Sequence, residues 1–508
     1  MRKALSFLLF SSLVVLFTAG CGSTRVMEPL GSGSGGGNAT VSLSMTDDPP
    51  AGVSVLFFQV DLTAAALESS SGTSVSLLAG NTPVQIDVTQ LQALSAFLST
   101  ANLAAGQYSS MSLTFANPQL VIYNAADTSL SNCAVGSVCQ MTPSVDGSAT
   151  VSISTAPFPV TLSAGSPLGL LIDFHLNNVI QPDLSVNLGV SDGVTVAELP
   201  PAPTLPRFGM LTGTVESVST ANGTFALETP WGRTFMIGTT SSTAYDNFPS
   251  SACTTAGIGC LAQGEIVQVQ IGAVASGGGL TASQVTYVQA ASAQTVEGTV
   301  IGVAPCPCEV VPAPVYVTMM VHQNPTAASM FPIGGLVEAI VPPSASLSVD
   351  ADGFTMPSGV SFTENGQIVV GQNLTMTVQP GTVSNNPIVT PAHGLGPSVM
   401  FTASSVELEP SQMTGPILAV DDTAQSFTFG GSGGPFFFPW PWLPNAVTSF
   451  NVLTTGQTGY EGFTPESFDG LATGQVVSVN GWLFAAQAGG STPTIVAQGL
   501  VLRPNAMF

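Results

Sequence analysis

Few residues of this chain have the type and spacing that catalysis or metal binding needs. The three histidines, His175, His322 and His393, occur singly, and no HExxH, HxH or Cys-x-x-Cys spacing is present. A zinc site requires several such ligands, and short spacings of this kind usually supply two of them. We therefore interpret each histidine as structural, although His322 and His393 lie in the same segment and could meet in space. We predict no metal site and no cofactor.

Paired carboxylates are the other source of catalysis, because an acid and a base of this type can cleave a glycosidic bond. Asp47-Asp48 and Asp421-Asp422 are such pairs, but both stand where a predicted strand turns, a natural place for Asp. Asp350-Ala351-Asp352-Gly353 resembles the start of a calcium loop, yet Ser358 and Gly359 occupy the region of its closing Glu. A hydrolase would also need two carboxylates converging in a cleft, one with a raised pKa. We predict no catalytic residue and a non-enzymatic protein, with a polysaccharide hydrolase as the alternative.

One aromatic segment is a candidate ligand-binding surface. Residues 435–444 read PFFFPWPWLP, and the prolines forbid a regular central strand or helix there. We interpret the segment as a loop that caps a domain core. The alternative is an exposed platform that stacks on sugar rings or a partner protein, with Trp440, Trp442 and Phe437 as the binding residues.

The N-terminus has the pattern of an export signal. Arg2 and Lys3 precede an apolar run from Leu5 to Phe17, which is shorter than the roughly 20 residues that span a bilayer. The sequence Thr18-Ala19-Gly20-Cys21 then resembles a bacterial lipobox, although Leu is preferred where Thr18 stands. The resemblance implies a signal peptide over residues 1–20 and a lipid-modified Cys21 that anchors the protein to a membrane. A plain signal peptide followed by an incidental cysteine is the alternative.

The remaining six cysteines form three sequence-local pairs, as expected for an oxidising compartment outside the cytoplasm. Gly22 follows Cys21 in place of the Asp associated with inner-membrane retention, so the lipoprotein resemblance implies an outer-membrane or surface location. The pairs give the disulfide candidates Cys133/Cys139, Cys253/Cys260 and Cys306/Cys308. The first two spacings suit a bridge that pins a loop, whereas the third is tight enough to strain one.

The composition argues against nucleic acid as a partner and against a disordered chain. With 508 residues, only 7% of them charged, and a formal net charge of -23, the protein would repel a phosphate backbone, so we predict no nucleic-acid binding. Hydrophobic residues make up 44% of the chain, too many for ordinary disorder. The length allows several domains, each with its own core.

Two linkers bound a first domain over residues 39–199. A Gly/Ser tether occupies 21–38, and a Pro-rich linker occupies 200–207. Between them, Val41, Leu43 and Met45 alternate with polar residues as in a half-buried strand, and Leu91 to Leu98 has the spacing of a short helix. This pattern predicts a β-sandwich-like domain. The order of Thr46-Asp47-Asp48-Pro49, Ile86-Asp87-Val88, Leu103 to Tyr108 and Leu171 to Phe174 resembles the bacterial lipoprotein family called domain of unknown function 4382, which has no established activity.

The rest of the chain contains three copies of one pattern, over residues 208–290, 295–408 and 414–503. Each copy opens with a strand that begins at Gly213, Gly298 or Gly415. A middle strand follows Gly264, Gly371 or Gly474, and a closing strand contains Ala282, Ala403 or Ala497. Constant strands with loops of varying length predict small β-barrels, which leave no exposed edges. The pattern resembles the repeat family called domain of unknown function 5666, and by analogy we expect OB-like barrels.

Together these observations predict an all-β protein: a β-sandwich-like domain followed by three OB-like barrels, exported and lipid-anchored in the cell envelope. We expect a binding or structural module with a protein or glycan partner. The alternatives are an envelope polysaccharide hydrolase and an accessory subunit of an outer-membrane complex.

Overall fold

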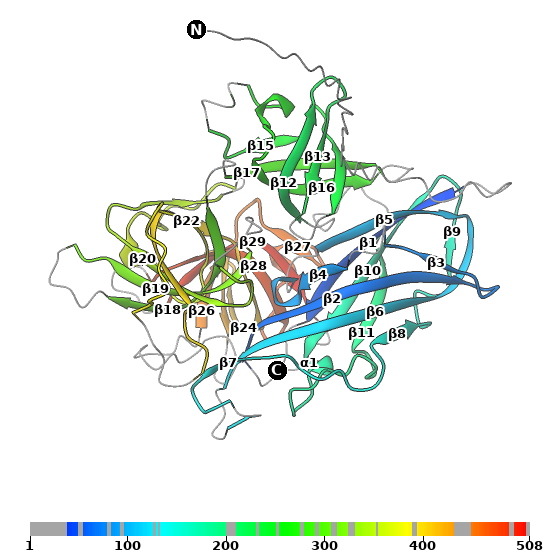
Figure 1. Cartoon of the computed structure of the whole chain (residues 1–508), viewed down its shortest axis with the longest axis horizontal. Coiled ribbons are helices and arrows are strands. Elements are labelled where there is room, and N and C mark those ends of the chain that lie inside the picture. The colour runs from blue at the N-terminus through cyan, green and yellow to red at the C-terminus, as the bar shows by residue number, and fades with distance from the viewer. Residues whose placement is uncertain are drawn as a thin grey trace, which may run out of the picture.

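The computed structural model describes residues 38–503 (Figure 1), with internal gaps at 49–53, 79–82, 92–95, 125–128, 131–132, 200–209, 230–232, 250–252, 254, 275–278, 290–293, 306–311, 324–330, 352–353, 389–393, 431–448 and 487–491. The predicted all-β class is confirmed: strands are the main regular element of the described residues, which contain a single α-helix, α1 (Leu176–Val179). No helix in these ranges is both long enough and apolar enough to span a bilayer.

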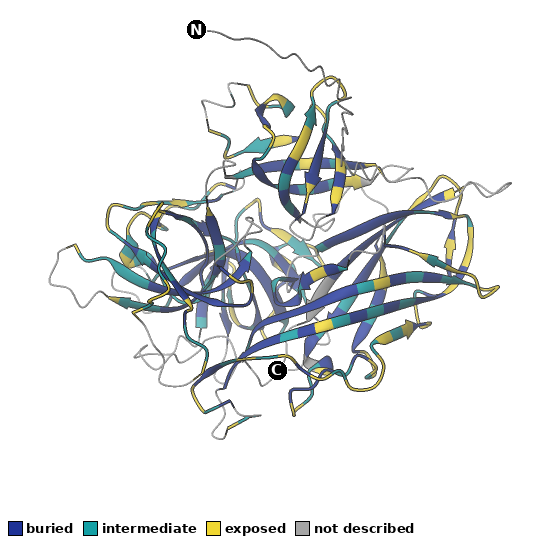
Figure 2. Ribbon diagram, viewed as in Figure 1, coloured by how far each residue is buried: buried dark blue, intermediate teal, exposed yellow. Residues whose placement is uncertain are grey.

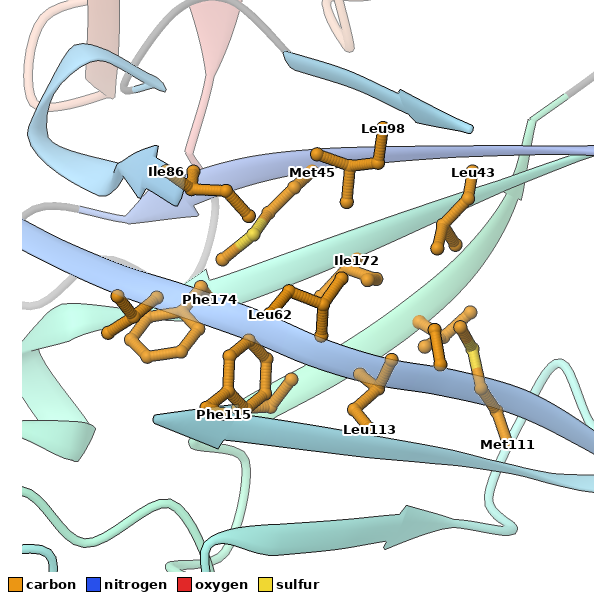
Figure 3. Packing of buried hydrophobic residues seen from close by; sticks show 14 of the residues in the cluster. Leu43, Met45, Leu62, Ile86, Leu98, Met111, Leu113, Phe115, Ile172 and Phe174 are labelled. Carbon is orange, nitrogen blue, oxygen red and sulfur yellow. The ribbon is translucent and has the colours of Figure 1, made fainter. Parts of the chain in front are cut away.

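The first domain consists of two facing sheets. The first sheet has the order β11-β10-β1-β5, and the second has β3-β2-β6-β7 with β4 on β2 and with β8 and β9 on β6. Apolar side chains from both sheets meet in a shared core, into which Leu43 and Met45 of β1 point from one sheet and Leu62 and Phe115 from the other (Figure 3). This is the predicted sandwich. Its strands are β1 (Asn38–Asp48), β2 (Ser54–Ser69), β3 (Ser74–Ser76), β4 (Val84–Asp87), β5 (Ala96–Ala104), β6 (Gly106–Tyr123), β7 (Val138–Met141), β8 (Thr150–Ile153), β9 (Val160–Leu162), β10 (Pro167–His175) and β11 (Val194–Leu199).

The helix predicted from Leu91 to Leu98 is wrong. Leu91 ends a 3-10 helix, η1 (Val88–Leu91), and Leu98 lies in β5, which pairs with β1. The spacing misled because both faces of β5 are buried: Leu98 enters the sandwich core, while Phe97 packs into the core of the first barrel. A strand covered on both sides loses the alternation of apolar and polar residues that distinguishes it from a helix.

The predicted repeats form three closed five-stranded barrels. In each copy the first strand pairs with the second and fourth, the second with the third, and the fifth with the fourth and, in parallel, the third. This strand order is that of an OB-like barrel. An additional short strand, which lies between the third and fourth strands in the sequence and is not counted among the five, pairs in parallel with the fifth in every copy.

The three barrels have the following elements. Barrel 1 contains β12 (Met210–Ser219), β13 (Thr224–Glu228), β14 (Thr234–Gly238), β15 (Ala244–Asp246), η2 (Ile258–Cys260), β16 (Ile266–Val274) and β17 (Leu280–Gln289). Barrel 2 contains β18 (Thr295–Pro305), β19 (Val315–Gln323), β20 (Leu336–Val341), β21 (Ser346–Val349), η3 (Asn365–Gln367), β22 (Asn373–Val378) and β23 (Val399–Glu409). Barrel 3 contains β24 (Ser411–Asp421), β25 (Ser426–Gly430), β26 (Ser449–Leu453), β27 (Gly459–Glu461), η4 (Phe468–Gly470), β28 (Val476–Phe484) and β29 (Thr494–Leu502).

A repeated turn explains the glycine that precedes each middle strand. Gly264, Gly371 and Gly474 have φ values of 88°, 92° and 89°, a region that side chains disfavour. The residue after each glycine turns back and accepts the backbone N–H three residues earlier, at 2.8, 2.8 and 2.7 Å; these residues are Glu265, Gln372 and Gln475. The turn directly precedes the fourth strand of each barrel, whose alternate side chains are buried in the core.

The four units are packed against one another. Leu56, Phe57 and Tyr123 of the sandwich share a buried apolar cluster with Ile301 and Met320 of barrel 2. Trp482 and Phe484 of barrel 3 join the core of barrel 2, and Arg233 Nη1 of barrel 1 donates to Leu98 O of the sandwich at 3.0 Å. Buried positions accordingly run through the strands of every unit (Figure 2).

Candidate functional site

Four carboxylates gather at a pocket between barrels 1 and 2. Barrel 2 contributes Glu297 from β18, Asp350 from beyond β21, and Glu407 and Glu409 from β23. The opposite wall, from barrel 1, includes Thr212, Gln268 and Tyr287. The cavity holds about 30 Å³, room for about two water molecules.

Strand register brings these acids together. Glu297 lies opposite Thr375, and Thr375 lies opposite Glu407, so the three form one row across β18, β22 and β23. Asn373 and Glu409 are opposite each other in the next row that faces the same way. The alternate residues enter the barrel core, namely Val296, Leu374, Met376, Val406 and Leu408.

The two barrels meet through equivalent faces. Thr212 and Glu297 each precede the opening glycine of their copy, and Gln268 and Thr375 each stand four residues after the middle glycine. Barrel 3 has Thr414 and Ser478 at these positions, where their hydroxyl oxygens lie 2.6 Å apart and Arg503 Nε donates to Ser478 Oγ at 3.1 Å. Of the three copies, the second therefore carries an acidic version of this face.

Burial between the barrels changes the protonation of three acids. It raises the pKa of Glu407 to about 7, with a further contribution from the charge of Asp350. Burial also raises the pKa of Glu297, and it holds the pKa of Glu409 well above its ordinary value, helped by the neighbouring carboxylates. No Lys or Arg is among the described residues that line the pocket.

Asp350 connects all three barrels. Its Oδ1 accepts a hydrogen bond from Asn247 Nδ2 of barrel 1 at 2.8 Å. Its backbone N–H donates to Leu408 O at 3.0 Å, and its backbone oxygen accepts from Trp482 Nε1 of barrel 3 at 2.6 Å. The fully buried Trp482 therefore fixes the position of one pocket acid.

A second polar cluster joins the sandwich to barrel 2. His322 Nδ1 lies 2.6 Å from Asp87 Oδ2, and His322 Nε2 lies 2.9 Å from Thr299 Oγ1 and 3.2 Å from Gln90 Nε2. A hydroxyl, an imidazole and a carboxylate in this order also occur in hydrolase triads. The side chain of His322 is only 2% exposed, so a substrate has no access to the imidazole, and we assign the cluster to the joint between the two units.

The structure tests some of the predicted site residues. Disulfides Cys133–Cys139 and Cys253–Cys260 are present. Cys21, Cys306, Cys308, His393, Phe437, Trp440 and Trp442 lie outside the described residues. Within the described ranges, no three His, Cys, Asp or Glu side chains are arranged to hold a metal ion.

Glu297, Glu407 and Glu409 were not predicted as a group. The alternation Val406-Glu407-Leu408-Glu409 does place both acids on the outer face of the closing strand of copy two. No local pattern in the sequence indicates that this face packs against barrel 1, so the burial of these two acids could not be predicted.

Comparison with known proteins adds a family to the first domain. The family model described as domain of unknown function (DUF4382) matches residues 38–188 and confirms the resemblance predicted for that domain. No curated protein matches the chain. The wild-type single-stranded DNA binding protein from Thermus aquaticus is 9% identical over 42% of this chain and 95% of that chain, with a TM-score of 0.15. A deletion mutant of it is 11% identical over 42% and 96%, with a TM-score of 0.14, and similarity this low supports no functional conclusion.

Proposed function

We propose that this protein is a non-enzymatic lipoprotein of the bacterial cell envelope that serves as a binding or structural module, held on a lipid at Cys21. The observation that carries the proposal is the pair of disulfides, Cys133–Cys139 and Cys253–Cys260, downstream of a leader that ends at a cysteine. Disulfides persist in oxidising compartments, which the leader would reach. The family match over residues 38–188 begins where the Gly/Ser tether ends.

The finer family assignment belongs to this proposal. We infer that the three barrels are copies of the repeat family called domain of unknown function 5666, supported by their common strand order and the recurring turn before the fourth strand. Such repeats would place the surface loops of three barrels within reach of a protein or glycan partner.

A polysaccharide hydrolase is the second candidate, because Glu297, Glu407 and Glu409 converge and have raised pKa values. Pocket size favours the binding module: ligand pockets usually enclose about 300–1,000 Å³, whereas this cavity encloses about 30 Å³. Release of reducing sugar from isolated envelope polysaccharide by the wild type, and its loss in E407Q/E409Q, would establish the hydrolase instead.

Fractionation of cells tests location. We expect the wild type in the membrane fraction, digested by protease added to intact cells if it faces outward, and C21S released from the membrane. A wild-type protein in the cytosol with reduced cysteines would contradict the proposal.

The partner is tested with the purified full chain on a glycan array and in pull-downs from envelope extracts. W440A/W442A is the matched variant. Loss of a bound glycan or protein in the variant, with an unchanged melting temperature, would assign the aromatic segment to binding. Unchanged binding and a lowered melting temperature would assign it to capping a core.

A further inference from the structure

Among the described residues that line it, the acidic pocket has four carboxyl groups and neither Lys nor Arg. Glu297, Asp350, Glu407 and Glu409 share it, and on the side of barrel 1 the titratable neighbour is Tyr287, whose pKa burial raises, with Glu265 adding to the effect. Among the described residues, His322 is hydrogen-bonded to Asp87 and Thr299, and its interaction with Glu297 favours ionisation of that carboxyl. The arginines of the described barrels are directed elsewhere, Arg233 to Leu98 O and Arg503 to Ser478 Oγ.

A buried amide oxygen beside these acids has no hydrogen-bond donor. Asn373 is only 6% exposed, and its Nδ2 donates to Glu297 Oε1 at 3.3 Å. Its Oδ1 is buried without a hydrogen-bond donor, although Asn373 is opposite Glu409 in the strand register. A buried acceptor of this kind costs free energy unless a donor reaches it, and a protonated carboxyl is such a donor.

We propose that the contact between barrels 1 and 2 is a pH-sensitive joint, closed while the pocket carboxyls of barrel 2 hold protons and loosened when they ionise. Opening would give the carboxylates more water than the closed pocket can hold, since the pocket has room for only about two molecules. Asn247 of barrel 1, which donates to Asp350, would lose its partner in the open state. The joint rests on this geometry and does not depend on where in the cell the protein is located.

The direction of the effect follows from proton linkage. A carboxyl that binds its proton more tightly in the closed state stabilises closure at low pH, and the stabilisation is lost as pH rises from the ordinary pKa to the raised one. For Glu407 this window runs from 4.5 to about 7. That shift alone corresponds to an up to about 300-fold change in the ratio of closed to open molecules, and we expect at least a tenfold change because Glu407 is partly exposed.

The test measures the distance between the barrels by electron–electron double resonance in the full chain, with spin labels at M236C of barrel 1 and I388C of barrel 2. Both positions are exposed, at 59% and 54%. Background cysteines outside the two disulfides are replaced (C21S, C306S and C308S), and each distance is measured both with and without EDTA. We expect one narrow distance at pH 5 and a second, broader population at pH 8.5, with E407Q/E409Q remaining narrow at both values.

E466Q is the matched control, because Glu466 is an exposed acid of barrel 3, and it should behave as the wild type. A wild-type distribution that is the same at pH 5 and pH 8.5 would overturn the proposal. So would an opening that persists unchanged in E407Q/E409Q, or one that appears only without EDTA, because the latter would make the pocket respond to a metal ion and not to protons.

Discussion

Gly298 provides the sharpest test of how the repeated pattern builds a barrel. A Cβ atom added at this position would lie 2.1 Å from Met320 O and 2.9 Å from its carbonyl carbon, in the neighbouring strand β19. Real contacts of this kind exceed about 3 Å, so G298A must push β18 and β19 apart by nearly 1 Å at the backbone. Forcing a methyl group into such a site costs about 1–3 kcal/mol. Alanine also lowers the conformational entropy of the unfolded chain, which stabilises the folded state by about 0.4–1 kcal/mol. The expected net destabilisation is therefore about 1–2 kcal/mol.

Urea unfolding followed by tryptophan fluorescence measures this difference, since Trp482 is buried against the core of barrel 2. The matched control is G499A in β29, where an added Cβ meets nothing within 4 Å. We expect G298A to unfold at a lower urea concentration than the wild type, and G499A at the same concentration or a higher one. If G298A is as stable as G499A, Gly298 is not required by the approach of β18 and β19, and this reason for the glycine fails.

Two further variants test the contact between the sandwich and barrel 2 and the disulfide Cys133–Cys139. H322A leaves the carboxylate of Asp87 without its imidazole donor inside the interface, so we expect a loss of about 2–3 kcal/mol in the unfolding free energy from thermal melts, and a loss below 0.5 kcal/mol would show that the contact is not stabilising. C133S/C139S opens a loop with a sequence separation of 6, so we expect about 2 kcal/mol of destabilisation in non-reducing urea titrations. Identical titrations for wild type and variant would mean that the bridge contributes nothing to stability.

The barrels could be predicted because their pattern is local. The middle strands place Val267 and Val269, or Val477 and Val479, at alternate positions after a glycine, and these side chains are fully buried as the period of a strand requires. Three copies of one pattern also allowed a single interpretation to be checked against the other two. The strand order within each barrel followed by analogy with a known fold, and the pairings bear it out.

Contacts between units could not be predicted in the same way. Phe97 and Leu98 are adjacent in the sequence but enter the cores of two different units, and the spacing from Leu91 to Leu98 imitates that of a helix. In the sequence, Glu407 and Glu409 have the pattern of exposed acids on the outer face of a strand. In the structure, that face packs against barrel 1. Polar residues at an interface between domains contact a surface whose residues lie far away in the sequence. A short spacing within one segment therefore gives no sign of such an interface.

The central claim is that the chain is exported and lipid-anchored through Cys21, and intact mass spectrometry of the protein extracted from membranes tests it most directly. We predict a chain that begins at Cys21, carries the added mass of acyl groups and retains both disulfides. A chain that still carries residues 1–20, with an unmodified Cys21 and free thiols at Cys133 and Cys139, would contradict the claim.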